Sequence, residues 1–210
     1  MESFKLKQYL KKSWWKYAIP IFITPFLLSY AFDLKDKPKD EEELQIFIAC
    51  DTFIDNSPIK KASEYLKDVG IRELNTYFYS QESPNYETMF RLQGVLYSDI
   101  FIAPLKDMGS FSSYAKDGLF LSLNETRLEY SDELEKLTND DGDIWALKIY
   151  DPNAREYNKI TSFPNWLNFE NVSKPLYIAI SADRPNIKEN EHDETIWLFN
   201  YLMGYVYEKA

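Results

Sequence analysis

The chain has very little cysteine and histidine, with one of each, Cys50 and His192. A single cysteine cannot form an intrachain disulfide, and the usual zinc sites draw several ligands from cysteine and histidine. A Ser/His/acid triad would depend on His192 alone, which lies in the polar run KENEHDET. We therefore expect neither enzymatic activity nor a bound cofactor or metal.

Glycine is also scarce, with 6 residues among 210, and neither G-x-G-x-x-G nor G-x-x-x-x-G-K occurs. Basic clusters are missing from most of the chain. The net charge is −10, but residues 1–32 carry +4, which leaves −14 for the remainder. Because binding to phosphates needs clustered lysine and arginine, this acidic body excludes nucleic acid as an expected partner.

What the chain does have is apolar and aromatic residues, at 45% and 17% of the sequence. This content is enough to build a packed core and argues against global disorder. One part of it is a run without charge, residues 18–32, AIPIFITPFLLSYAF. A helix that crosses the hydrocarbon core needs about 20 apolar residues, so the run is short, and Trp14, Trp15 and Tyr17 extend it as an interfacial belt.

These features predict a basic cytoplasmic segment (residues 1–17), a transmembrane anchor (18–32) and an acidic linker (33–43) before an extracytoplasmic domain (44–210). Lysines ahead of the apolar run place the N-terminus inside, so we expect a single-pass protein of the cell membrane. Two alternatives remain open. Ser29-Tyr30-Ala31 fits a signal-peptide cleavage site, and the run also fits a buried core helix.

The first half of the domain alternates strands with helices. LQIFIAC (44–50), ELNTYFYS (73–80) and SDIFIAP (98–104) read as buried strands. Ser57-Pro58 and Ser83-Pro84 open two helices between them. This β-α-β-α-β order predicts an α/β fold with a parallel sheet, whose ligands gather at the carboxyl ends of the strands.

The second half is less regular. We expect a short strand at 118–123, a charged helix at 127–137 and strands at 144–151 and 175–182, followed by an amphipathic helix from residue 190 onward. NDDGD (139–143) offers four oxygen ligands, but its spacing does not fit an EF-hand loop, and a type I′ hairpin-like turn is the favoured interpretation.

The order of these pieces resembles the type II extracellular solute-binding proteins of ABC importers, in particular the branch that includes maltose-binding protein. SDIFIAPLKDMGSFSSYAKDGLFLSL is similar to the family's third strand, loop, short helix and next strand. DGDIWALKIYD is similar to its strand leading to the hinge, and LYIAISADRPNIKENEHDETIWLFNYL to the returning strand and helix of its first lobe. Only residues 152–175 fill the place of the second lobe, which is too short for a lobe with its own core.

The resemblance implies a single three-layer lobe with a mostly parallel sheet, preceded by one transmembrane helix. It implies a solute-binding-like module that recognises a carbohydrate or another small solute for an ABC importer, whose permease or another membrane protein would be its partner. Carried over by position, the ligand groups fall near four residues: Thr52, Asp55, Lys106 and Asp107. Three further residues add a hydrogen-bonding and stacking surface: Tyr150, Asp151 and Trp166. The alternative for these carboxylates is that they are turn and cap residues, and the alternative for the chain is an accessory or scaffold protein at the membrane that binds no small molecule.

Overall fold

The computed structural model describes Trp14, Lys16 and residues 19–30, 37–51, 57–105, 120–124, 127–153, 172–182 and 193–204. The chain divides into two compact units, Met1–Pro38 and Lys39–Ala210. In the first unit, residues 19–30 form one helix with every residue exposed. Within the described part of the chain, no helix combines the length and the apolarity that crossing a membrane requires. The anchor over 18–32 therefore remains a prediction.

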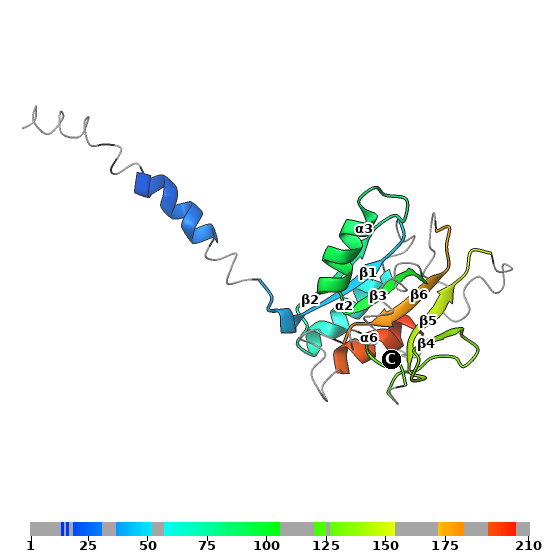
Figure 1. Cartoon of the computed structure of the whole chain (residues 1–210). Coiled ribbons are helices and arrows are strands. Elements are labelled where there is room, and N and C mark those ends of the chain that lie inside the picture. Colours follow the sequence, from blue (N-terminus) through cyan, green and yellow to red (C-terminus); the bar gives the residue numbers. More distant parts are fainter. Residues whose placement is uncertain are drawn as a thin grey trace, which may run out of the picture. The chain divides into compact units, whose positions relative to one another are not determined.

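The second unit is a mixed α/β domain built on one sheet of six strands, in the order β2-β1-β3-β6-β5-β4 (Figure 1). Its strands are β1 (Glu43–Ile48), β2 (Glu73–Phe78), β3 (Ile100–Pro104), β4 (Lys136–Thr138), β5 (Ile144–Tyr150) and β6 (Leu176–Ile180). Its helices are η1 (Asp40–Glu42), α2 (Ser57–Asp68), α3 (Tyr86–Met89), η2 (Phe90–Val95) and α6 (Asp193–Leu202).

The predicted β-α-β-α-β order of the first half is confirmed, since β1 pairs in parallel with both β2 and β3. The expectation of a mostly parallel sheet is wrong, because the other three pairings, β3–β6, β6–β5 and β5–β4, are antiparallel. Tyr150 at the end of β5 is opposite Leu176 at the start of β6, so the chain reverses direction between them. A short apolar strand that is buried on both faces has the same sequence pattern in either direction, which is why the sequence did not reveal the reversal.

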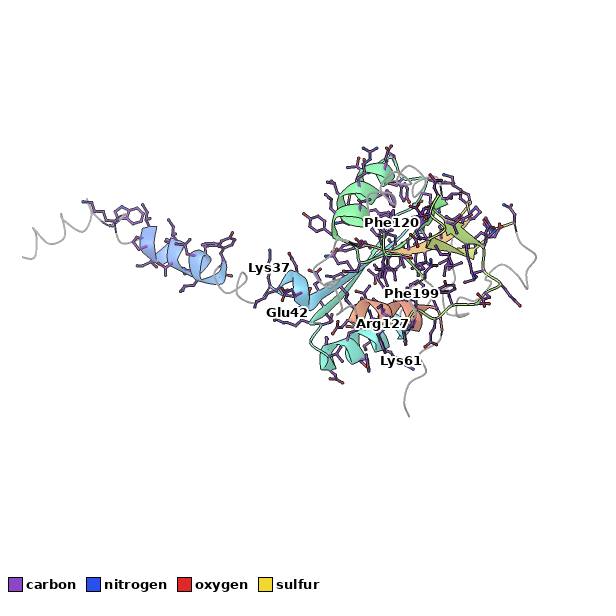
Figure 2. All side chains as sticks on the ribbon, turned by 60° about the horizontal axis from the view of Figure 1, so that its bottom comes forward. Lys37, Glu42, Lys61, Phe120, Arg127 and Phe199 are labelled. Atoms are coloured by element: carbon purple, nitrogen blue, oxygen red, sulfur yellow. The ribbon has the colours of Figure 1, made fainter. Side chains whose placement is uncertain are left out.

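Helices lie on both faces of the sheet, with α3 and η2 on one face and α2 and α6 on the other (Figure 2). On the α3 face, the Phe47 ring of β1 packs against Tyr79, Tyr86 and Phe90, at centroid distances of 5.6, 6.2 and 5.5 Å. On the opposite face, Leu66 of α2 and Phe199 of α6 are fully buried. This side-chain packing joins the helices to the sheet through a single apolar core.

The helix predicted after Ser83-Pro84 forms in two parts, with α3 continuing into the wider π-helical turns of η2. Gly94 lies where η2 passes over β1. A Cβ atom at this position would lie 3.5 Å from the Phe47 ring and 3.4 Å from that of Phe90. The helix therefore runs at contact distance over the central strand. At its end, the Ser98 hydroxyl donates to the Gln93 carbonyl oxygen at 2.8 Å.

The predicted charged helix at 127–137 is wrong, because the described residues there form turns and then β4. The buried Asn200 side chain of α6 explains the difference. Its Nδ2 donates to the Arg127 carbonyl oxygen at 2.9 Å, and its Oδ1 accepts from the Glu129 backbone N–H at 2.9 Å. A distant side chain therefore binds the Arg127 carbonyl oxygen, which would accept the first hydrogen bond of a helix starting at this residue. Of the strand predicted at 118–123, the described residues 120–123 form one isolated bridge, from Phe120 to Ser181.

The NDDGD segment is a hairpin turn between β4 and β5, as predicted, but of a different type. The Gly142 N–H donates to the Asn139 carbonyl oxygen at 3.1 Å, and Gly142 has a φ of 87°. This arrangement is a three-residue loop that ends in a left-handed glycine, a common hairpin connection. The Asn139 side-chain oxygen accepts from the N–H groups of Asp141 and Asp143.

Candidate functional site

The carboxyl ends of four strands lie at one end of the sheet, which we call the carboxyl edge. β1, β2 and β3 run in the same direction, and β5 joins them because β3 and β5 are both antiparallel to β6. Ligands of open α/β sheets bind outside the carboxyl ends of the strands. The described residues that follow these ends are 49–51, 79–81, 105 and 151–153. The carboxyl edge is therefore the place to look for polar groups.

A lysine held between two carboxylates lies on the β5 side of this edge. Lys148 Nζ forms an ion pair with Glu135 Oε2 and lies 3.7 Å from Asp151 Oδ2. The two residues are also joined through the backbone, because the Lys148 N–H donates to the Glu135 carbonyl oxygen at 2.9 Å. The hydrogen bond to Glu135 raises the pKa of Lys148 above its usual value. The ammonium group is therefore held charged, which suits binding better than proton abstraction.

Two tyrosines complete this group. Tyr177 of β6 is opposite Lys148 of β5, and its hydroxyl donates to Glu135 Oε1 at 3.3 Å. Burial, followed by the charge of Glu135, raises the pKa of Tyr177. Burial, followed by the charge of Asp151, raises the pKa of Tyr150. Both phenols therefore stay protonated at neutral pH.

We call these five residues the β5–β6 polar cluster: Glu135, Lys148, Tyr150, Asp151 and Tyr177. The cluster combines one ammonium group, two carboxylates and two phenols, which is a mixture of hydrogen-bond donors and acceptors. Such a mixture suits a ligand with many hydroxyl groups, since each hydroxyl both donates and accepts. The partly exposed Tyr150 ring adds apolar surface of the kind that packs against the carbon face of a sugar, whereas the Tyr177 ring is buried.

A second polar position lies on the β2 side of the carboxyl edge. Gln81 Nε2 donates to the Ala49 carbonyl oxygen at 3.0 Å, which fixes the orientation of the amide. Gln81 Oε1 is buried and accepts no hydrogen bond from any residue that the structure describes. The Tyr79 hydroxyl, two residues earlier, donates to Gln93 Oε1 of η2. Because a buried acceptor without a donor is costly, Gln81 Oε1 is a candidate contact for a bound hydroxyl.

Of the residues predicted for the site, Tyr150 and Asp151 are at the carboxyl edge, where both have partly exposed side chains. The other five, Thr52, Asp55, Lys106, Asp107 and Trp166, lie outside the described residues. The sequence analysis missed Lys148, Glu135, Tyr177 and Gln81. Lys148 carried a usable signal, as the single charge within the apolar strand IWALKIY. Glu135 gives no such signal, because the sequence around it predicts a helix.

No group of three or more potential metal ligands forms within the described part of the domain. Cys50 is buried next to the end of β1, and His192 lies outside the described residues.

Comparison with known proteins yields no relatives: no family model, no curated protein and no solved structure matches this chain. The functional inference consequently depends on the fold and on the groups at the carboxyl edge.

Proposed function

We propose that this chain is a membrane-anchored, extracytoplasmic binding module that resembles the first lobe of a type II solute-binding protein. In this proposal, the carboxyl edge binds a carbohydrate or another polyhydroxylated solute, and the ABC importer permease or another membrane protein is the partner. The chain has no catalytic role.

The observation that carries the proposal is the position of β6. The chain leaves the sheet at Tyr150, returns at Leu176 and runs back between β3 and β5 into α6. This course is the one that the resemblance implies for a lobe whose chain departs at the hinge and returns through a strand and a helix. Helices on both sheet faces further support a three-layer lobe (Figure 2).

The ligand class follows from the chemistry of the carboxyl edge. The β5–β6 polar cluster offers donors and acceptors, and Gln81 Oε1 offers a further acceptor. One lobe covers one side of a solute, so we expect weak binding that the partner strengthens.

The N-terminal helix supports the anchor. Its residues 19–30 contain no charged side chain, and they are exposed on every side of the helix. A helix that is apolar all round is stable where its surface is covered, as in a bilayer.

Ligand binding is tested by thermal unfolding of the full chain in detergent micelles against a panel of sugars and polyols. A true ligand raises the midpoint progressively with its concentration, and at a concentration of about 100 Kd it adds about 2.7 kcal/mol to the free energy of unfolding. Asp151→Asn and Tyr150→Phe should each reduce this stabilisation. Asp141→Asn is the matched control, because Asp141 is an exposed residue in the turn before β5, at the other end of that strand.

Two results would contradict the ligand proposal. One is a panel in which no sugar or polyol raises the midpoint in a concentration-dependent way. The other is a ligand whose effect is the same in Asp151→Asn, Tyr150→Phe and the Asp141→Asn control, because binding would then lie elsewhere.

Topology is tested with a cysteine placed on the domain surface. Glu82→Cys introduces an exposed thiol, while the native Cys50 is buried and should not react. We expect a membrane-impermeant maleimide to label this variant in intact cells, and deletion of residues 18–32 to release the domain from the membrane fraction. Labelling only after lysis would overturn the extracytoplasmic assignment.

One observation favours the alternative, a scaffold protein without a small-molecule ligand. β2 is a six-residue edge strand, paired within the described sheet on one side only. Edge strands can accept a strand from a partner. This alternative would be supported if no sugar stabilised the chain and if crosslinking through β2 captured a membrane protein.

A further inference from the structure

An aromatic stack covers part of the outer surface of α2 and α6. The Tyr65 ring of α2 and the Trp197 ring of α6 are stacked with centroids 4.1 Å apart and an angle of 14°. Tyr201, one turn further along α6, stacks on Trp197 at 5.2 Å and 16°. The indole is thus held between two phenol rings, which fixes its orientation.

The stack borders a small hollow, which we call the aromatic hollow. It is lined by Tyr65, Leu66, Val69, Glu194 and Trp197 and holds about 130 Å³. Tyr65 is 47% exposed and Val69 is 46% exposed, so the hollow opens to the surface of the domain. Leu66 is fully buried in the core and forms a rigid base.

A carboxylate completes the lining. Glu194 lies in the first turn of α6, is partly buried and takes part in no ion pair within the described residues. Because phenol rings cover the faces of Trp197, the electron-rich face that the aromatic hollow offers is that of the half-exposed Tyr65 ring, beside the Glu194 carboxylate. Aromatic faces attract ammonium and guanidinium groups, and the attraction increases where a carboxylate shares the site.

We propose that the aromatic hollow binds the side chain of a lysine or arginine on a partner protein. The size favours a single side chain, because sites for whole small molecules usually measure about 300–1,000 Å³. The charge favours a basic partner, because the chain beyond residue 32 carries −14. Neighbouring Tyr65 and Val69 supply exposed apolar surface for the hydrocarbon stem of such a side chain. This surface is independent of any ligand at the carboxyl edge.

The test uses the full chain in detergent micelles, labelled with 5-fluorotryptophan, and follows the fluorine NMR signals. The chain has 5 tryptophans, and Trp197→Phe identifies the signal of Trp197. The probes are N-acetyl-arginine amide, N-acetyl-lysine amide and tetramethylammonium, with N-acetyl-norleucine amide as the neutral control. We expect the two capped basic amino acids to shift the Trp197 signal in a saturable way, and the norleucine derivative to leave it unchanged.

Variants test the two parts of the lining. Glu194→Gln should weaken binding of the arginine probe by about fivefold, the effect of losing a partly exposed ion pair. Tyr65→Leu keeps the site apolar but removes a ring. It should weaken binding of the arginine probe by about threefold. Glu64→Gln is the matched control, since it removes the same charge from α2 without lining the hollow, and it should bind as the unmodified chain does.

Three outcomes would overturn the proposal. The first is a Trp197 signal that responds to neither capped basic amino acid. The second is an equal shift with N-acetyl-norleucine amide, which would indicate a purely apolar contact. The third is a response to tetramethylammonium alone, because the hollow would then admit a free quaternary ammonium ion and exclude a protein side chain.

Discussion

The two halves of the sheet differ in strand direction, in side-chain chemistry and in regularity. In the β2-β1-β3 half, all pairs are parallel and no register shift interrupts them. In the β6-β5-β4 half, all pairs are antiparallel, and the register shifts once in β4–β5 and once in β5–β6. β3 is buried at every position, whereas β5 carries the partly exposed Lys148 and Tyr150.

This difference separates stability from chemistry. The parallel half has helices on both faces, with Phe47 packed on the α3 face and Leu66 buried on the α2 face, so its sequence is constrained by the core. The antiparallel half contributes Lys148, Tyr150 and Tyr177 to the β5–β6 polar cluster. We expect substitutions in the first half to affect mainly the free energy of unfolding, and those in the second half to affect binding as well.

The largest effect should come from the parallel half. Phe47→Ala removes a fully buried ring that packs against three other aromatic rings. We expect a loss of about 3–5 kcal/mol in the free energy of unfolding, measured by urea titration of the full chain in detergent. Leu92→Ala, at a position that is 49% exposed on η2, is the control and should change it by less than about 0.5 kcal/mol. If Phe47→Ala and Leu92→Ala lowered the free energy of unfolding equally, the assigned core would be contradicted.

Lys148→Met tests the charged cluster of the antiparallel half. It keeps the length of the side chain but leaves Glu135 and Asp151 without their shared cation. We expect a loss of about 1–2 kcal/mol in the free energy of unfolding. In a double-mutant cycle with Glu135→Gln, the coupling energy should be at least about 0.5 kcal/mol. Additive effects would mean that the ion pair contributes nothing to stability.

The hairpin that joins β4 to β5 should show a smaller effect. Gly142→Ala places a side chain at a φ of 87° where no atom lies within 4 Å of the new Cβ, so its cost is conformational and not steric. We expect a loss of about 1 kcal/mol in the same urea titration. Gly142→Asn is the matched variant, since asparagine tolerates this conformation better. If Gly142→Ala lowered the free energy of unfolding no more than Gly142→Asn does, the assigned turn would be contradicted.

The smallest effect is a change in the response to alkaline pH. Tyr177 and Lys148 both have raised pKa values in the folded chain. The stability they contribute is therefore complete below the unfolded pKa values, about 10 and 10.4, and is lost as the pH rises through the folded ones. Tyr177→Phe should make the decline of the unfolding free energy above about pH 10 shallower. If the unfolding free energies of Tyr177→Phe and of the original chain declined in parallel up to the highest pH, Tyr177 would not be the cause of the decline.

The difference between the halves also determined what the sequence could predict. The parallel half was predictable because Ser57-Pro58, Ser83-Pro84 and the apolar runs are local signals. In the antiparallel half, β5 and β6 were predictable from their apolar runs, but the segment before β4 was not. Its Arg127 and Glu129 backbone groups bind Asn200, which lies about seventy residues away in the sequence. A tertiary hydrogen bond of this kind leaves no mark on local periodicity.

The candidate site follows the same rule. Tyr150 and Asp151 were predictable because Tyr150 ends a strand that the sequence identifies and Asp151 directly follows it. Glu135 joins them only because β4 pairs with β5 and brings the residue before β4 next to Lys148. Residue spacing alone cannot reveal a contact that depends on strand pairing.

The pairing of Tyr150 with Leu176 has a consequence for the length of the segment between them. Since the chain leaves and re-enters the sheet at neighbouring positions, the segment closes a loop whose ends the sheet already holds together. The entropic free-energy cost of closing a flexible loop grows slowly, by about 0.6 kcal/mol for each doubling of its length. The same six-stranded sheet can therefore accept either a short connection or a long insertion at this point with little change in its own stability.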